Sequence, residues 1–263
     1  MKKKLVILLC LIVFGVSFAN SQTTSKINPY IEGEVMNYEG NLNKLVFRGI
    51  SVANLTFTTS KAENGKDYLV KAEAISKGTL LKLFRFSFLY RVTSTIDSER
   101  FVALKTVKRD EQGDRVRDSE ANFDHTEKKV TYVETDPKDS ARPPRRIASA
   151  IEDETHDLIS GIYILRSMPL AVGNSFSLNI SDSGLVYKVP VSVTKKEMQN
   201  TIFGKVMCFR VEPQVFGKGR MIESDGSMII WITDDNRRLP VRANLNTSIG
   251  KVDVKLKKYE IKR

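Results

Sequence analysis

The chain has 263 residues, of which 41% are apolar and 28% charged, and 42 basic against 31 acidic side chains give a formal net charge of +11. This length suffices for a sizeable core in one large β domain or two small ones. Basic and acidic residues alternate, as in residues 108–120, and the one tight basic cluster, residues 142–146, contains two prolines. The distribution argues against a nucleic-acid partner and indicates at most a peripheral contact with an anionic membrane surface.

The first residues have the pattern of a cleaved signal peptide. Three lysines precede the apolar stretch of residues 5–16, and the small residues Ala19 and Ser21 follow it. We predict a signal peptide over residues 1–21, with cleavage after Ala19 as the alternative. The apolar stretch is shorter than the roughly 20 residues that cross a bilayer, and no later stretch reaches that length. We therefore expect an exported protein of the periplasm or cell envelope that is not transmembrane, with residues 22–263 forming a single β-rich domain.

The two cysteines predict neither a lipid anchor nor a disulfide. Cys10 follows two leucines and precedes further apolar residues, whereas a lipidated cysteine follows a small residue at the end of the signal. Cleavage leaves Cys208 alone, so an internal disulfide is excluded even in an oxidising compartment. Because Cys208 lies in an apolar run, we expect a buried, inert thiol and not a nucleophile.

Most of the mature sequence alternates apolar and polar residues with the period of strands that bury one face. Residues 52–59, 67–75 and 251–257 show the pattern most plainly. Turn-forming residues, such as 64–65 and 182–184, separate the runs. We expect roughly a dozen strands, with residues 142–146 as an irregular connection.

Residues 78–90 form the most apolar mature segment. As a strand it would place Phe84, Phe86 and Phe88 on one face, and the preceding leucines would form a short amphipathic loop or turn. Ordinary core packing accounts for such a segment, and the alternatives are the lip of an apolar pocket or an edge that touches a membrane. The segment is the first choice for ligand contact, through Leu80, Leu81, Leu83, Phe84, Phe86 and Phe88.

Residues 153–169 contain the single convincing helix, expected at about 155–168. Leu158, Ile162 and Leu165 define its main apolar line, Thr155 or Asp157 can cap its start, and the proline at 169 ends it. Further apolar residues widen the line over most of the circumference, so the helix should be enclosed by strands. The predicted fold is mainly β: a strongly curved antiparallel sheet, or a partly open β-barrel, enclosing one principal α-helix.

Arg166 falls inside the apolar arc of this helix. A buried guanidinium is costly unless a carboxylate or carbonyl pairs with it. We predict a structural ion pair between helix and sheet, and the alternatives are an anion or lipid-headgroup site, with Tyr163 nearby, or a side chain that extends to solvent. The candidate partners are Asp157, Glu212, Asp234 and Asp235.

Catalytic chemistry finds little support in the sequence. The two histidines, His125 and His156, and Cys208 do not form a metal-ligand cluster, and no glycine-rich phosphate loop is present. Ser160 follows His156 by one helical turn, which leaves a hydrolase as a remote alternative. We expect no metal, no cofactor and no enzymatic activity.

Several segments, in chain order, resemble the DUF3108 family of bacterial exported proteins of unknown function. Residues 157–166 resemble its D-x-x-S-x-x-Y-x-x-R pattern, residues 204–208 its G-x-F/M-x-C strand, and residues 231–241 its W-x-x-D-D…R-x-P-V hairpin. Residues 249–252 are similar to its closing strand, and weaker similarity reaches back to residues 33–34. The resemblance implies an envelope protein and carries over no catalytic residues.

Three functions are compatible with these features. The first is a non-enzymatic envelope protein that binds a lipid or other hydrophobic molecule inside the curved sheet, since the expected fold resembles the half-barrels of periplasmic lipoprotein carriers. The second is a scaffold or protein-interaction module with a solid core, whose protein partner the sequence does not name. The third is the hydrolase using Ser160 and His156, and fold alone does not decide among them.

Overall fold

The computed structural model describes residues 27–44, 47–247 and 250–262. Within these ranges the chain forms one fifteen-stranded sheet and two short helices, α1 (Gly78–Phe84) and α2 (Leu158–Ile164). The predicted signal peptide and its cleavage positions lie outside the described residues. The strands are β1 (Glu34–Lys44), β2 (Phe47–Lys61), β3 (Tyr68–Ser76), β4 (Phe88–Ile96), β5 (Ala103–Gln112), β6 (Arg115–Asp124), β7 (Lys129–Thr135), β8 (Arg145–Ala150), β9 (Thr155–Asp157), β10 (Ser175–Asp182), β11 (Leu185–Thr201), β12 (Gly204–Pro213), β13 (Ser227–Thr233), β14 (Pro240–Thr247) and β15 (Gly250–Ile261).

Strands that are neighbours in the sheet are nearly all neighbours in the chain. The order is β8-β7-β6-β5-β4-β3-β2-β1-β15-β14-β13-β12-β11-β10-β9, so β1 and β15, the first and last strands, pair in the middle of the sheet. Every pair is antiparallel except the short pairing of β9 with β10. Alternating runs joined by tight turns produce this succession of hairpins. The predicted mainly β fold is confirmed, with fifteen strands where the sequence indicated about a dozen.

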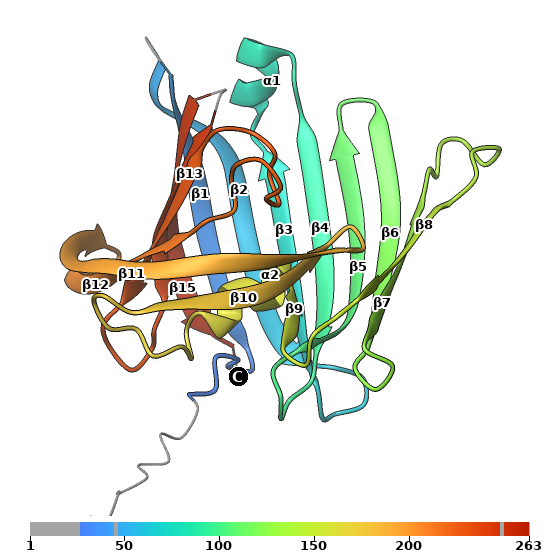
Figure 1. The fold of residues 1–263 in the computed structure, drawn as a ribbon. Coiled ribbons are helices and arrows are strands. Elements are labelled where there is room, and N and C mark those ends of the chain that lie inside the picture. The colour runs from blue at the N-terminus through green and yellow to red at the C-terminus, as the bar shows by residue number, and fades with distance from the viewer. Residues whose placement is uncertain (1–26, 45–46, 248–249, 263) are drawn as a thin grey trace, which may run out of the picture.

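The sheet curls until its two ends face each other, and α2 lies inside the curve (Figure 1). The edge strands β8 and β9 do not pair, so the barrel stays open along a seam. The β10–β11 turn bridges this seam, because the Ser149 hydroxyl donates to the Gly184 carbonyl at 2.7 Å. Gly184 has φ +81°, and a Cβ there would lie 2.6 Å from that of Tyr132, so the close approach requires glycine.

The principal helix is shorter than the sequence predicts. Residues 155–157 form β9, whose residues pair with Asn179–Ser181 of β10, and residues beyond 164 continue only as turns. The hydrogen bonds of this sheet edge hold the residues before 158 extended, and Asp157 then caps the helix. Enclosure by strands is nevertheless confirmed, with Ile159, Tyr163 and Ile164 buried in the main core.

The segment 78–90 was expected as a strand from residue 84, and this expectation is wrong. Residues 78–84 form α1, and β4 begins only at Phe88. Helix α1 stands at one end of the sheet, and residues 27–34 enter at the opposite end (Figure 1). Across the part of the chain that the structure describes, no helix has the length and hydropathy to cross a membrane.

The main core fills much of the concave side of the sheet around α2. Met36, Val70, Val191 and Ile232 are among its fully buried side chains. Cys208 is buried in the same core, and burial raises the pKa of its thiol to about 12. This environment agrees with the expected inert thiol, because the thiolate is the reactive form.

Candidate functional site

The start of α2 is held by a reciprocal pair of hydrogen bonds. The Asp157 carboxylate accepts from the Ser160 backbone N–H at 2.7 Å, and the Ser160 hydroxyl oxygen accepts from the Asp157 N–H at 2.9 Å. This capping box satisfies backbone donors that a helix start leaves free. The Thr106 hydroxyl of β5 also donates to Asp157 at 2.6 Å, so the cap ties the helix to the sheet.

The Ser160 hydroxyl is therefore committed to the helix cap. Ser160 is completely buried, and its Oγ also donates to the Asp157 carboxylate at 2.8 Å. His156 lies on β9, opposite Ile180 of β10, and is buried as well. A nucleophile needs access to substrate, so the geometry contradicts the hydrolase that uses these two residues. Within the described ranges, no three His, Cys, Asp or Glu side chains are grouped to hold a metal ion.

Tyr163 anchors the middle of α2 to the N-terminal segment. Its ring stacks on Tyr30 at 5.1 Å between centroids, and Tyr30 in turn stacks on Tyr68 of β3 at 5.1 Å. The Tyr163 and Thr59 hydroxyls are 3.1 Å apart and share a hydrogen bond. Burial raises the pKa of Tyr163, which keeps its phenol neutral. Stacking and the shared hydrogen bond give this side chain a structural role, and its expected role in ligand binding stays a prediction.

Arg166 forms a buried ion pair with Glu34 at the start of β1. Arg166 Nη1 and Nη2 donate to the two Glu34 oxygens at 2.6 and 2.9 Å, and Nη2 also donates to the Arg237 carbonyl at 3.1 Å. Both side chains are at most 2% exposed. Burial opposes the charge on Arg166, but the two hydrogen bonds to Glu34 raise its pKa. The guanidinium thus joins the helix, the first strand and the β13–β14 turn.

None of the four expected partners of Arg166 contacts it. Asp157 caps α2, and Glu212 accepts from Thr194 and pairs with Arg210. Asp234 pairs with Lys196, and Asp235 pairs with Arg237. The ion pair between helix and sheet exists, but its carboxylate comes from Glu34, more than one hundred residues away in the chain.

An apolar cavity of about 380 Å³ lies beside α2. Leu158, Ile162 and Leu165 of the helix segment form one wall. Residues of β2, β3, β4, β10, β11, β12, β13 and the β12–β13 connection form the others. The apolar side chains that complete the lining include Leu55, Phe57, Leu178, Ile180, Val189, Val191, Val215, Met221, Ile222, Met228 and Ile230. The helix therefore fills the curved sheet only in part.

Among the described side chains of residues 80–88, no leucine or phenylalanine lines this cavity. Leu80 and Phe88 pack against a separate small cluster of Leu42, Val52 and Ala53. Leu83 and Phe86 are 45% and 41% exposed at the end of the sheet where α1 stands. The side chains of Leu81 and Phe84 lie outside what the structure describes. The described side chains of this segment lie apart from the apolar cavity, because the segment turns away as α1, and their contact with a ligand stays a prediction.

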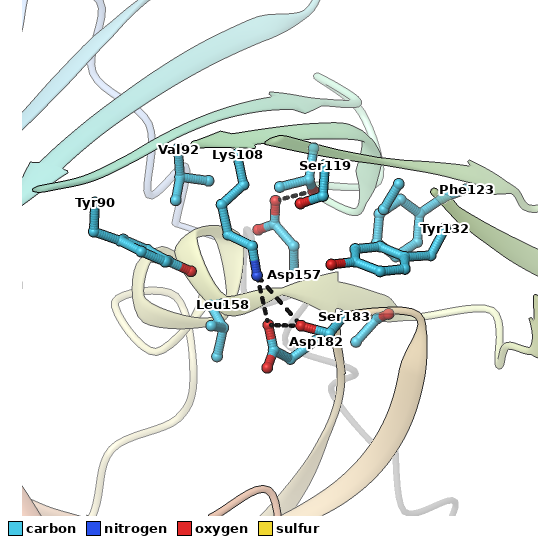
Figure 2. A pocket seen from close by; sticks show the side chains of 13 residues that line it. Tyr90, Val92, Lys108, Ser119, Phe123, Tyr132, Asp157, Leu158, Asp182 and Ser183 are labelled. Carbon is cyan, nitrogen blue, oxygen red and sulfur yellow. Dashed lines mark hydrogen bonds and ion pairs between the residues drawn. The ribbon is translucent and has the colours of Figure 1, made fainter. Parts of the chain in front are cut away.

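A small polar space adjoins the apolar cavity, and we call it the polar corner. Lys108 of β5 points into it, 3.6 Å from an Asp182 carboxylate oxygen and 3.3 Å from the Ser183 hydroxyl (Figure 2). Tyr90, Leu158 and Asp182 line both spaces. The polar corner offers about 30 Å³, enough for at least one water molecule.

The sequence matches the family described as "Protein of unknown function (DUF3108)" over residues 37–257. The chain belongs to the DUF3108 family. This membership confirms the resemblance drawn from residues 157–166 and the later strands. No curated protein matches the sequence of this DUF3108 chain.

Two solved structures are similar to this chain, and the first of them supports its fold. A beta-barrel-like protein of the DUF1849 domain of unknown function from Brucella abortus has a TM-score of 0.60 at 10% identity, covering 88% of this chain and 99% of that one. A putative exported protein with a YmcC-like fold from Bacteroides fragilis has a TM-score of 0.37 at 10% identity, covering 89% and 98%. The first likeness supports a barrel-like architecture for this DUF3108 protein and says nothing of its activity.

Sequence reasoning missed the residues that decide this site. Glu34 was not considered as the partner of Arg166, although it lies in the weakly similar segment at residues 33–34. Leu55 and Phe57 belong to a strand recognised by its alternation, but no local signal separates a cavity wall from a packed face. Met221 and Met228, two flexible apolar side chains around a connection, are the clearest signal that could have pointed to the cavity.

Proposed function

We propose that this DUF3108 protein is an exported, non-enzymatic envelope protein that binds a hydrophobic molecule, such as the acyl chain of a lipid, beside α2. The apolar cavity of about 380 Å³ carries the proposal. Engineered apolar cavities of about 150 Å³ stay dry and take up benzene. The signal-peptide pattern of residues 1–21 supports the export part of the proposal.

The walls of the cavity suit a chain more than a rigid, polar molecule. Burying apolar surface contributes about 25 cal/mol per Å², and the lining offers aliphatic side chains on nearly every side. Met221 and Met228 can adapt to the shape of an occupant, because methionine is unbranched and flexible. Ile162 is half-buried at the cavity wall, and it would gain van der Waals contacts with a bound molecule.

The α1 end of the sheet supports a peripheral contact with an anionic membrane. Leu83 and Phe86 are exposed there, next to Lys82 and Arg85. No acidic residue occurs between Glu73 and Asp97 in the chain, so the segment is purely basic. Exposed apolar side chains among lysine and arginine suit the boundary between headgroups and acyl chains.

A fluorescence titration with N-phenylnaphthylamine, a neutral apolar dye, tests the cavity. We expect saturable binding to the mature protein, and at least about tenfold weaker binding to Ile162→Trp, because the indole would occupy the space. Val107→Trp is the matched control, since Val107 is exposed on β5 away from the cavity lining. Equal dye affinity in wild type and Ile162→Trp would contradict the proposal.

A further inference from the structure

The polar corner stands where one end of a bound chain would lie. Tyr90, Leu158 and Asp182 are common to the walls of the apolar cavity and of the polar corner. In Figure 2 the Tyr90 hydroxyl, the Lys108 ammonium and the Asp182 carboxylate all lie on the Leu158 side of that corner. An amphiphile with its chain along α2 would therefore present its polar group to these three side chains.

The charges of the corner disfavour an anionic group. Lys108 is the one basic residue among the described side chains that line either space, and Asp182 already faces it at 3.6 Å. Asp157 adds a second carboxylate, whose recorded partners are the hydroxyls of Thr106 and Ser160 and a backbone N–H. Asp110 also contributes to the raised pKa of Tyr90, but it already forms an ion pair with Arg115 at 2.8 Å. An incoming carboxylate would meet more negative than positive charge in a partly desolvated site.

The hydrogen-bonding groups of the corner suit a small neutral head. The Tyr90 hydroxyl has no hydrogen-bond partner among the residues that the structure describes, and burial raises its pKa, so it stays a donor. Asp182 offers a carboxylate that accepts. A hydroxyl can accept from Tyr90 and donate to Asp182, whereas a carboxylate can only accept. The volume of about 30 Å³ admits a head of this size.

We infer that the occupant is a neutral amphiphile whose head is a single small hydrogen-bonding group, such as the hydroxyl of a long-chain alcohol. The inference rests on the proposed function, because it names the class of molecule for the same cavity. Tyr90 and Asp182 bind the head, and Lys108 holds Asp182 in place. Leu158 separates the chain from the polar group.

Displacement of N-phenylnaphthylamine by dodecanol and by dodecanoate, at neutral pH, tests this inference on the mature protein. We expect dodecanol to displace the dye at a concentration at least about tenfold lower than dodecanoate. A neutral head is easier to bury than a charged one in any apolar site. The effects of substitutions in the polar corner are therefore what show whether Tyr90 and Asp182 bind the head. Asp182→Asn removes a charge that repels dodecanoate, so the ratio of the displacing concentrations of dodecanoate and dodecanol should fall severalfold. Asp234→Asn breaks the ion pair with Lys196, away from the polar corner, and should leave this ratio unchanged.

A second variant keeps the test independent of how well Asp182→Asn folds. Tyr90→Phe should weaken dodecanol binding severalfold more than it weakens dye binding, because the variant loses only the hydroxyl and keeps the ring that lines the cavity. Equal displacement by both molecules, or an unchanged ratio in both variants, would overturn the inference. Failure of the dye itself to bind would instead overturn the proposed function, so the two failures are distinguishable.

Discussion

The two ends of the curved sheet differ in how completely they are filled. At the packed end, defined by Tyr30, Glu34, Tyr163 and Arg166, buried side chains stack and pair with one another. At the cavity end, towards α1, the other side of the same helix segment faces about 380 Å³ of apolar space. One side of this short helix segment therefore stabilises the fold through its contacts, and the other side lines a cavity that has room for a ligand.

The residues of the family pattern in 157–166 almost all make contacts that hold the helix segment to the rest of the fold. Asp157 and Ser160 cap α2, Tyr163 stacks on Tyr30, and Arg166 pairs with Glu34. Residues that line the cavity, such as Ile162 and Leu165, fall between the positions of the pattern. Each position of the D-x-x-S-x-x-Y-x-x-R pattern in this fold therefore makes a structural contact.

The largest expected effect is the loss of the ion pair at the packed end. Arg166→Ala leaves the Glu34 carboxylate buried without its partner, which costs about 3–5 kcal/mol in the free energy of unfolding. Urea denaturation followed by the fluorescence of Trp231 measures it. The double variant Arg166→Met with Glu34→Leu should recover much of this loss, because apolar pairs often replace buried ion pairs well. A loss below about 1 kcal/mol for Arg166→Ala would contradict the claim that the ion pair at the packed end stabilises the fold.

A thiol at the cavity end should be alkylated about a hundred times faster than the thiol of Cys208 at the packed end. Cys208 is buried at the packed end, and its pKa of about 12 leaves few thiolates at neutral pH. A thiol at the cavity end, introduced as Met228→Cys with Cys208→Ser, should be alkylated by iodoacetamide about a hundred times faster, since Met228 is only half-buried. Similar rates for the two thiols would mean that the ends do not differ in access.

Removing the helix cap should cost less than removing the ion pair. Ser160→Ala loses one half of the capping box and a hydrogen bond to Asp157, for about 1 kcal/mol in the free energy of unfolding. Ser167→Ala is the control, because its hydroxyl bonds only to the preceding turn. If Ser160→Ala instead retained full stability but lost a hydrolytic activity, the structural role given to Ser160 would be wrong.

The smallest effect concerns the exposed rim beside α1. The double substitution Leu83→Ser with Phe86→Ser should weaken binding to phosphatidylglycerol vesicles severalfold, corresponding to about 1 kcal/mol. Stability should be unchanged, since both side chains are exposed. Val107→Ser, an exposed site on β5, is the control in the same sedimentation assay. Undiminished vesicle binding of the double variant would remove the rim from the membrane contact.

The sequence predicted the architecture better than the site. Period-two alternation and turn residues were enough for a β fold, and the broad apolar arc of residues 158–168 was enough for an enclosed helix. Local patterns could not place β9, because its extended shape depends on pairing with Asn179–Ser181 of β10. They also could not assign Glu34 to Arg166, since that contact depends on how the first strand passes the helix. A cavity forms where side chains from several distant strands fail to fill the space between them, so the sequence of one segment cannot predict it.

The most direct measurement is a crystal structure of the mature protein grown with dodecanol that carries bromine at its far end. We predict an anomalous bromine peak inside the apolar cavity, between Ile162 and Met228, with the hydroxyl within hydrogen-bond distance of Tyr90 and Asp182. Bromine bound only outside the cavity, or a cavity closed by its own side chains with no bromine inside, would contradict the binding of a hydrophobic molecule beside α2.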